Sequence, residues 1–220
     1  MSPILANIYL HYALDLWFEK IVKPISEGQA YICRMADDFI CAFRYKADAD
    51  KFYKVLGKRL GKFKLELAEE KTKIVSFSRF RKYENTSFEF LGFEFRWAVS
   101  RNGKDIIKRR TSRGKLRKSI KAFSLWCKDN SSKRIRKIVE MLNSKYRGYF
   151  NYYGVIGNSK GINEFYGATL KILYKWLNRR SQRKSFNWNE FNVKMKWYGL
   201  IKPRVVEKAD NQIRFEECFA

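Results

Sequence analysis

The first 20 residues have the apolar periodicity of an amphipathic helix, which we predict over residues 3–20. The apolar positions that recur at helical spacing are Leu5, Ile8, Tyr12 and Leu16. Ser2 offers a capping hydroxyl and Pro3 suits the first helical turn. We expect Pro24 and Gly28 to end the helix.

Two short apolar runs follow, at residues 31–34 and 39–43, and they predict a β-hairpin around Asp37 and Asp38. Helical spacing returns over residues 48–63 and predicts a second helix. Its expected apolar face consists of Phe52, Val55, Leu56, Leu60 and Phe63.

Strand patterns resume at residues 73–77 and 88–97. In the second run the alternation changes phase next to Gly92, which predicts a bulge or a tight bend. The tripeptide Arg101-Asn102-Gly103 predicts a turn into a further strand at residues 104–109.

Beyond about residue 112 the pattern is helical throughout, with three clear apolar stripes and weaker periodicity from 187 to 198. The stripes are Leu116, Ile120, Phe123 and Trp126; then Ile135, Ile138, Leu142, Tyr146 and Tyr149; then Ile162, Phe165, Leu170, Leu173 and Leu177. We therefore expect an α+β fold in which mixed structure up to about residue 110 is followed by a basic helical bundle.

The composition suits a folded protein that binds a polyanion. The 220 residues are 45 % apolar and 17 % aromatic, and 47 Lys and Arg against 22 Asp and Glu give a net charge of +25. Basic and aromatic residues alternate closely at 145–150 and 174–176, and this mixture suits phosphates and unpaired bases. The alternative is a solvated basic surface whose aromatic residues all lie in the core.

The sequence disfavours a membrane protein, a secreted protein and a cysteine-bound metal site. No apolar run is long enough for a membrane helix, and no signal-peptide pattern occurs at the N-terminus. The four cysteines are scattered without metal-ligand spacing, so we expect reduced, mostly buried thiols in a cytoplasmic protein. The single histidine, His11, is expected on a helix flank without a catalytic role.

The most suggestive pair is Asp37-Asp38 between the two apolar runs. Adjacent carboxylates repel each other, and a divalent cation such as Mg²⁺, which prefers hard oxygen ligands, would cancel that repulsion. On the dipeptide alone, a polar turn that faces water is the simpler explanation.

The surrounding sequence favours the metal-binding explanation, because several segments together resemble group II intron-encoded reverse transcriptase/maturases. In chain order the resembling segments are Ser2–Leu10, Tyr31–Ile40, Leu65–Thr72, Phe90–Phe93, Arg147–Tyr153 and Trp176–Gln182. Each segment alone is weak, but the ordered set is specific.

The resemblance implies the end of a right-hand polymerase palm over 1–110, an α-helical thumb or maturase domain over 111–206, and a tail over 207–220. It assigns Mg²⁺ binding and phosphodiester formation to Asp37 and Asp38. It also implies that Lys71 lies near the incoming nucleoside triphosphate, although a solvated turn lysine is an alternative. Phe90, Leu91 and Gly92 match the turn that grips the primer.

Two departures bear on activity. Met35 stands where the family has a tyrosine, and the family's first metal-binding aspartate belongs to an earlier strand with no counterpart in this sequence. We therefore expect a fragment of a longer protein or a decayed reading frame, inactive in polymerisation by itself, and a separate N-terminal half is a candidate partner. No endonuclease pattern follows residue 206.

The resemblance also implies binding of intron RNA, alongside a DNA primer and deoxynucleoside triphosphates, in a bacterial cytoplasm. The candidate RNA-binding residues are Arg109, Arg110, Arg113, Arg147, Lys175, Arg179 and Arg180. Two alternatives remain: a non-catalytic, maturase-like splicing cofactor, and a reverse transcriptase of a defence system.

Overall fold

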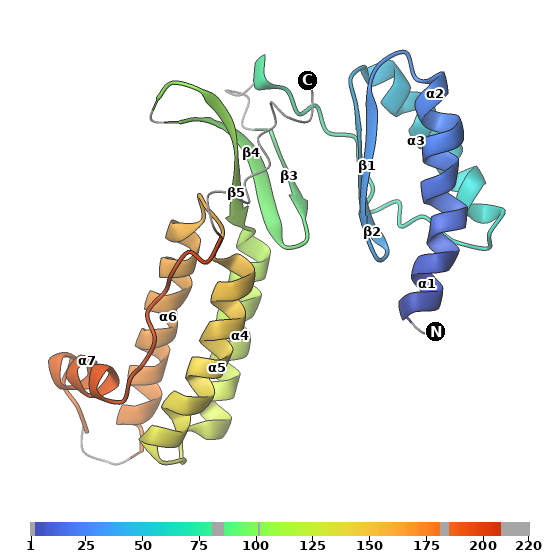
Figure 1. Ribbon diagram of the computed structural model, residues 1–220. Coiled ribbons are helices and arrows are strands. Elements are labelled where there is room, and N and C mark those ends of the chain that lie inside the picture. Colours follow the sequence, from blue (N-terminus) through green and yellow to red (C-terminus); the bar gives the residue numbers. More distant parts are fainter. Residues whose placement is uncertain (1–2, 81–85, 101, 181–184, 208–220) are drawn as a thin grey trace. The chain divides into compact units, whose positions relative to one another are not determined.

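A computed structural model describes residues 3–80, 86–100, 102–180 and 185–207. The chain forms two compact units, Met1–Leu91 and Gly92–Ala220, whose elements are drawn in Figure 1. The mixture of helices with small antiparallel sheets confirms an α+β fold. The expected functional division near residue 110 remains a prediction, since the compact units separate at residue 91.

The first unit begins with one continuous helical stretch that is longer than expected. It consists of α1 (Pro3–Leu10), the π-helical turns η1 (His11–Asp15) and η2 (Phe18–Val22), and α2 (Lys23–Ile25). Pro24 lies inside α2 rather than ending it, and the extended backbone begins at Ser26. Pro24 occupies the first turn of α2, after the π-helical turn η2, and a first turn tolerates proline because its N–H groups need no partner within the helix.

The expected apolar face of this helix is not the buried one. Leu5, Ile8 and Tyr12 are exposed. The helix instead buries Ala13, Leu14, Phe18 and Val22. Helical spacing identifies an apolar stripe, but the neighbouring elements decide which stripe they cover.

The predicted hairpin is confirmed as β1 (Ala30–Met35) paired antiparallel with β2 (Asp38–Phe43). The helix α3 (Lys46–Gly61) follows, and Figure 1 shows it beside the N-terminal helix on one side of the hairpin. The core of this unit lies between these elements and comprises Leu14, Phe18, Val22, Ala30, Phe52, Leu56 and Leu60. Val55, expected in the apolar face of α3, is exposed.

No strand forms at residues 73–77, which was a wrong prediction. The preceding residues form a turn in which the N–H groups of Lys71 and Thr72 donate to the carbonyl of Ala68. An alternating segment becomes a strand only when a neighbouring strand takes up its backbone hydrogen bonds. Residues 73–77 have no such neighbour in the part of the chain that the structure describes.

The expected strand over 88–97 is two strands, β3 (Ser87–Phe90) and β4 (Phe93–Val99), joined by a tight turn at Leu91-Gly92. Both turn residues have positive φ, 50° and 79°, as a two-residue type I′ hairpin turn requires. The predicted tight bend at Gly92 is therefore confirmed. The third strand, β5 (Asp105–Thr111), completes a sheet of order β3-β4-β5. The turn between β4 and β5 contains Asn102 and Gly103, while Arg101 lies outside the described residues.

The predicted helical bundle is confirmed as α4 (Arg113–Asn130), α5 (Ile135–Tyr153), α6 (Ser159–Asn178) and α7 (Trp188–Trp197). Its core contains residues of every predicted stripe, among them Leu116, Phe123, Ile138, Leu142, Tyr146, Ile162, Phe165 and Leu173. The hydroxyls of Tyr146 and Thr169 lie 2.6 Å apart inside it, so the hydroxyl of this fully enclosed tyrosine has a hydrogen-bond partner.

The segment 198–207 runs back from α7 along the bundle towards β5 (Figure 1), and we call it the return strap. Asn143 fixes its start, since the amide donates to the carbonyl of Gly199 and accepts from the N–H of Ile201. Glu207 fixes its end by accepting from Arg109 and from the N–H of Ile156. The strap thereby joins the bundle to the sheet of the same unit.

Two further sequence expectations have structural outcomes. None of the helices among the described residues is long and apolar enough to cross a membrane. Of the three cysteines among the described residues, Cys127 is buried, Cys41 is half-buried and Cys33 is exposed, while Cys218 lies outside the described residues. Cys33 therefore differs from the expected buried thiols, because it occupies an outward position of β1.

Candidate functional site

The two candidate carboxylates lie where the hairpin reverses. Met35 pairs with Asp38 as the last register pair, so Ala36 and Asp37 form the turn. Ala36 has a φ of 56°, a left-handed conformation that costs about 1 kcal/mol for a residue with a Cβ atom. Asp37 and Asp38 are both exposed, and neither side chain bonds to another described residue. The turn of the predicted hairpin is therefore open to water, whereas the catalytic role of its two carboxylates remains a prediction.

Arg34 fastens this turn to the N-terminal helix. Its guanidinium donates twice to the carboxylate of Asp15, at 2.8 and 2.6 Å. The remaining terminal nitrogen donates to the side-chain oxygen of Asn7 and to the carbonyl of Ala36, both at 2.9 Å. One planar side chain therefore connects three points in the helix and the turn, and the Ala36 bond helps to hold the strained conformation.

The electrostatics of this contact follow from its geometry. The hydrogen bonds and the charge of Arg34 hold the pKa of Asp15 below its usual value, against partial burial, which raises it. The same contact raises the pKa of Arg34. His11 adds a weaker contact, with its Nδ1 3.4 Å from the carboxylate of Asp15, and it lies on a helix flank as expected. Both partners thus remain charged at neutral pH.

The chemistry of the turn suits a hard divalent cation only in part. Two adjacent carboxylates supply the oxygen ligands that Mg²⁺ prefers, and no described cation neutralises them. However, the described ranges contain no group of three or more potential metal-ligating side chains. Further ligands would have to come from water, substrate or another polypeptide segment.

The other residues of the predicted polymerase site are dispersed along the chain, and all but Gly92 belong to the first unit. Met35 ends β1 and is exposed. Lys71 lies in the turn after α3 with an exposed side chain, and it forms no ion pair with any residue of the described ranges. Phe90 ends β3, and Leu91 precedes the boundary between the units. Their roles in nucleotide and primer binding remain predictions.

Gly92 has a physical requirement for glycine. Besides its positive φ, a Cβ atom there would lie 2.9 Å from the hydroxyl oxygen of Tyr153. Its carbonyl also accepts from the N–H of Ser112, the residue that caps α4. Gly92, the second residue of the β3–β4 turn, is therefore packed directly against the start of the helical bundle.

Neighbouring arginines of β5 have different environments. Arg109 donates to both carboxylate oxygens of Glu207, at 2.6 and 2.7 Å, so it has a structural function in holding the return strap. Burial alone would raise the pKa of Glu207, but the hydrogen bonds from Arg109 and from Ile156 N–H outweigh it and lower the pKa. Arg110 points to the other face of the sheet by strand alternation, and no carboxylate of the described residues forms an ion pair with it.

The candidate RNA-binding residues of the helical bundle also differ in whether they make a structural contact. Arg113, Arg147 and Lys175 are exposed on α4, α5 and α6. Arg179 lies over the ring of Trp176, with 5.4 Å to the centroid. Arg180 donates to the carbonyl of Lys133 at 2.6 Å, so it also supports the turn between α4 and α5. Four of these five cations are thus available to a ligand without breaking a backbone contact.

An exposed aromatic residue on α7 was not identified from the sequence. Phe191 and Met195 bury one side of this helix, whereas Trp197 is 76 % exposed. Its ring meets the edge of Tyr198 at a centroid distance of 4.7 Å, and Tyr198 packs against the bundle core. Lys194 and Lys196 flank it. This arrangement provides an exposed ring that Tyr198 supports, with two basic residues near it in the sequence.

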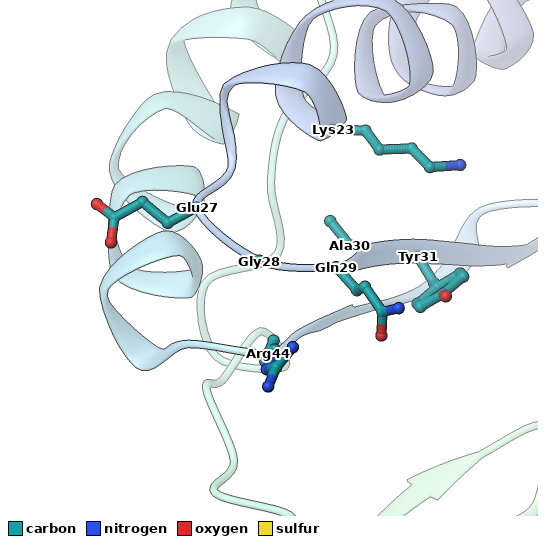
Figure 2. A pocket seen from close by; sticks show the side chains of 7 residues that line it. All are labelled: Lys23, Glu27, Gly28, Gln29, Ala30, Tyr31 and Arg44. Atoms are coloured by element: carbon teal, nitrogen blue, oxygen red, sulfur yellow. The ribbon is translucent and has the colours of Figure 1, made fainter. Parts of the chain in front are cut away.

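A shallow pocket of about 370 Å³ lies at the other end of the hairpin from the carboxylates. Figure 2 shows its lining of Lys23, Glu27, Gly28, Gln29, Ala30, Tyr31 and Arg44. Ala30 and Arg44 stand at the strand ends that are remote from the Asp37-Asp38 turn. The pocket therefore does not belong to the candidate metal site.

The contacts of Arg34 were also missed by sequence reasoning. A usable signal was its place in strand alternation, since Ile32 and Arg34 occupy the inward positions of β1. A charged residue at an inward position requires a partner. The sequence does not indicate that the partner is Asp15, because that pairing depends on how the helix packs on the hairpin.

Comparison with known proteins gives two family matches. Residues 1–95 match the family model described as reverse transcriptase (RNA-dependent DNA polymerase). Residues 113–193 match the group II intron maturase-specific domain. The first match includes the Asp37-Asp38 turn, and the second includes the four helices up to Val193. The chain is thus a reverse transcriptase-related polypeptide joined to a maturase-specific domain.

The curated relatives agree with this combination. The chain is 30 % identical to the group II intron-encoded protein LtrA of Lactococcus lactis subsp. cremoris, and equally to that of strain MG1363. The aligned region covers 60 % of this chain and 25 % of each relative, so the chain corresponds to about a quarter of their length. The two family matches and these relatives together make the chain similar to group II intron reverse transcriptase/maturases, as its sequence motifs indicated.

Proposed function

We propose that the first unit contributes the catalytic turn of an RNA-directed DNA polymerase, in the part of the fold that corresponds to a palm. The observation that carries this proposal is the exposed Asp37-Asp38 pair, held at a hairpin reversal within the segment that matches reverse transcriptases. Arg34 would keep the turn in one conformation, so that both carboxylates are presented together.

The two carboxylates would hold Mg²⁺, which in this chemistry activates a primer hydroxyl and stabilises charge on the reacting phosphate. The role of the chain's own residues is to bind and orient. Asp37 and Asp38 supply oxygen ligands, while Lys71 would supply positive charge near a triphosphate. Because the described residues offer no third acidic ligand close to this pair, we expect polymerisation to require a supplied N-terminal half.

Primer extension tests this function. The chain alone should incorporate no labelled deoxynucleotide, and a mixture with the N-terminal half of a group II intron reverse transcriptase should restore extension. Asp37→Ala should abolish the restored activity. Asp129→Ala, which removes an exposed carboxylate from the end of α4, is the matched control and should retain it. Restored extension by Asp37→Ala would contradict the assignment.

We further propose that the helical bundle is a thumb-like domain that binds intron RNA and assists splicing. Between residues 111 and 206 there are 23 Lys and Arg against 4 Asp and Glu, many more cations than the core requires. Neutralised phosphates release counterions, so log K should fall linearly with log salt by about 0.7 to 0.9 per contact. Binding of the full chain to intron RNA, titrated between about 50 and 200 mM salt, tests this proposal.

Arg179 is the cleanest site for a variant in that assay. Arg179→Glu reverses an exposed charge and removes no backbone contact, whereas Arg180→Glu also removes the bond to Lys133. A salt-independent affinity of the wild type would contradict RNA binding through phosphates. If the chain binds RNA but the complemented mixture never extends a primer, the non-catalytic splicing cofactor becomes the better description.

A further inference from the structure

Three cations share one face of the β4–β5 hairpin, and we call Arg96, Lys108 and Arg110 the sheet triad. Arg96 and Lys108 are register partners, and Arg110 is two residues beyond Lys108 on the same strand. Register partners of an antiparallel pair point to the same side with Cβ atoms about 5 Å apart, and like charges in this position destabilise the sheet. The sequence pattern therefore opposes the fold unless an anion is present.

The opposite face of the hairpin is already occupied. There Phe93 packs against the rings of Tyr152 and Tyr153, and Arg109 bonds to Glu207. The N–H of Thr111 donates to the buried side chain of Asn158 at 3.0 Å. The triad thus lies on the face of this hairpin that does not pack on the bundle.

The cations of the triad are partly withdrawn from water and lack compensating bonds. All three are half-buried, and among the described residues none forms an ion pair. The Nε–H of Arg110 is buried without a hydrogen-bond partner. Burial, and then the charge of Arg96, lower the pKa of Arg110. The triad is therefore a positively charged site in which at least one buried N–H donor has no acceptor.

Two acidic residues lie on the triad's side of the sheet: Glu94 on β4 and, across the Leu91-Gly92 turn, the exposed Glu89 on β3. Glu94 is the register partner of Arg110, and its charge offsets part of the lowering of the Arg110 pKa. Glu94 forms no ion pair within the described part of the chain. Two carboxylates, of which only Glu94 stands beside the triad in the strand register, do not balance three cations. A net positive charge therefore remains on this face, and the anionic phosphodiesters of a nucleic acid would neutralise it.

We propose that the sheet triad binds the phosphodiester backbone of a nucleic acid, with the guanidinium groups of Arg96 and Arg110 donating to phosphate oxygens. Arginine suits this ligand because its planar fork matches two oxygens of one phosphate. This inference rests on the proposed nucleic-acid function and adds a location outside the helical bundle. Neither family match includes Lys108 or Arg110.

Neutralising variants of the full chain distinguish this site from a structural one, because two effects should occur in opposite directions. Lys108→Gln removes the like-charge contact, so the unfolding temperature of the free protein should rise by about 1–3 °C. The same variant should bind a 20-base-pair RNA duplex about three- to tenfold more weakly near 100 mM salt. Its salt slope should fall by about 0.9 for the lost phosphate contact.

Lys104→Gln is the matched control, since it removes one exposed cation from the turn of the same hairpin. It should change neither the unfolding temperature nor the salt slope. The triple variant Arg96→Gln, Lys108→Gln and Arg110→Gln should lose slope in proportion to its contacts. Parallel titrations with an RNA–DNA hybrid and a DNA duplex identify the favoured backbone, and inorganic phosphate tests whether an isolated anion suffices.

The outcomes separate the inference from the function on which it rests. If the wild type binds and the triple variant has the slope of Lys104→Gln, the triad is not a phosphate site, while the RNA-binding function stands. If Lys108→Gln lowers the unfolding temperature, the triad is structural and the inference fails. If inorganic phosphate at the same charge concentration competes fully, the site binds isolated anions rather than a backbone. If the wild type binds no nucleic acid, the proposed function itself is wrong.

Discussion

The two units of the chain treat their apolar residues differently. The bundle leaves no residue of its predicted stripes exposed, and Leu142 and Tyr146 are wholly enclosed. The first unit has a small core and leaves large apolar side chains on the surface, among them Ile4 at 71 % and Ile25 at 74 % exposure. Apolar periodicity therefore predicted helices in both units. It predicted burial only where three long helices cover one another.

The units also use their cations differently. In the first unit Arg34, Lys23 and Lys51 form ion pairs with carboxylates of the same unit. In residues 111–206 the 4 acidic residues are too few to pair with the 23 basic ones. Charge in the first unit thus contributes to internal structure, whereas charge in the bundle is available to an external anion.

The largest expected effect tests the difference in burial. Leu142→Ala should lower the free energy of unfolding by about 2–5 kcal/mol, since it removes fully buried atoms and leaves a cavity. Ile8→Ala, at a side chain that is 51 % exposed, should cost less than about 0.5 kcal/mol. Urea unfolding followed by circular dichroism measures both. Similar losses in the two variants would show that the first unit is packed as tightly as the bundle.

The next effect concerns how the first unit holds its turn. Arg34→Ala removes the bonds to Asp15, Asn7 and Ala36, and it should destabilise the hairpin by about 1–3 kcal/mol. Hydrogen exchange of the amides in β1 and β2 should accelerate accordingly. Arg44→Ala, at an exposed position of the same hairpin, should leave exchange unchanged. Unchanged protection in Arg34→Ala would mean that the hairpin holds the turn by itself.

A smaller effect tests whether the bundle binds bases as well as phosphates. Trp197→Ala should weaken binding of an unpaired RNA strand by about 1 kcal/mol, roughly fivefold, because a stacked base loses its aromatic surface. Trp197→Phe should retain most of the affinity. An oligonucleotide with abasic sites measures the charge contribution alone and should not distinguish the variants. Equal binding of the intact strand by wild type and Trp197→Ala would limit the bundle to phosphate recognition.

The smallest effect is shared by both units and depends on pH. Asp15 and Glu207 have lowered pKa values in the folded chain, so each stabilises its unit above the ordinary carboxylate range. That contribution is lost as pH falls below roughly 4, where the carboxylates take up protons. We expect about 1 kcal/mol or less for each pair. Asp15→Asn should flatten the acid response of the first unit only, and Glu207→Gln that of the second unit only.

The sequence predicted much of this structure where a local rule applied. The hairpin around Asp37-Asp38, the bend at Gly92 and the long helices of the bundle each follow from spacing or turn chemistry among neighbouring residues. The strand at 73–77 was wrong because strand formation also requires a partner. The exposure of Leu5 depended on which side of the helix its neighbours cover. The continuation of the helix through Pro24 depended on the position of this proline at the start of α2.

The candidate site was predicted in its residue types but not in its supporting contacts. Motif order singled out Asp37 and Asp38, but it gave no information on the contacts of Arg34 with Asp15 and Ala36 that hold their turn. By contrast, Arg109 and Arg110 were equivalent in the sequence, and only strand register separates the one that holds Glu207 from the one that faces Arg96. Register, and contacts between residues 19 and 98 positions apart, are the information that single-sequence patterns lack.

The bond between Arg109 and Glu207 closes a loop across 98 positions of the sequence, and this has a consequence for the order of biosynthesis. During synthesis the strands and α4 to α7 all emerge before the residue that ties the return strap to the sheet. The helical bundle can therefore collapse early around its local contacts. Its attachment to β5 is completed only when Glu207 has left the ribosome. The joint between sheet and helices should accordingly be the last part of this unit to become resistant to a protease added during translation.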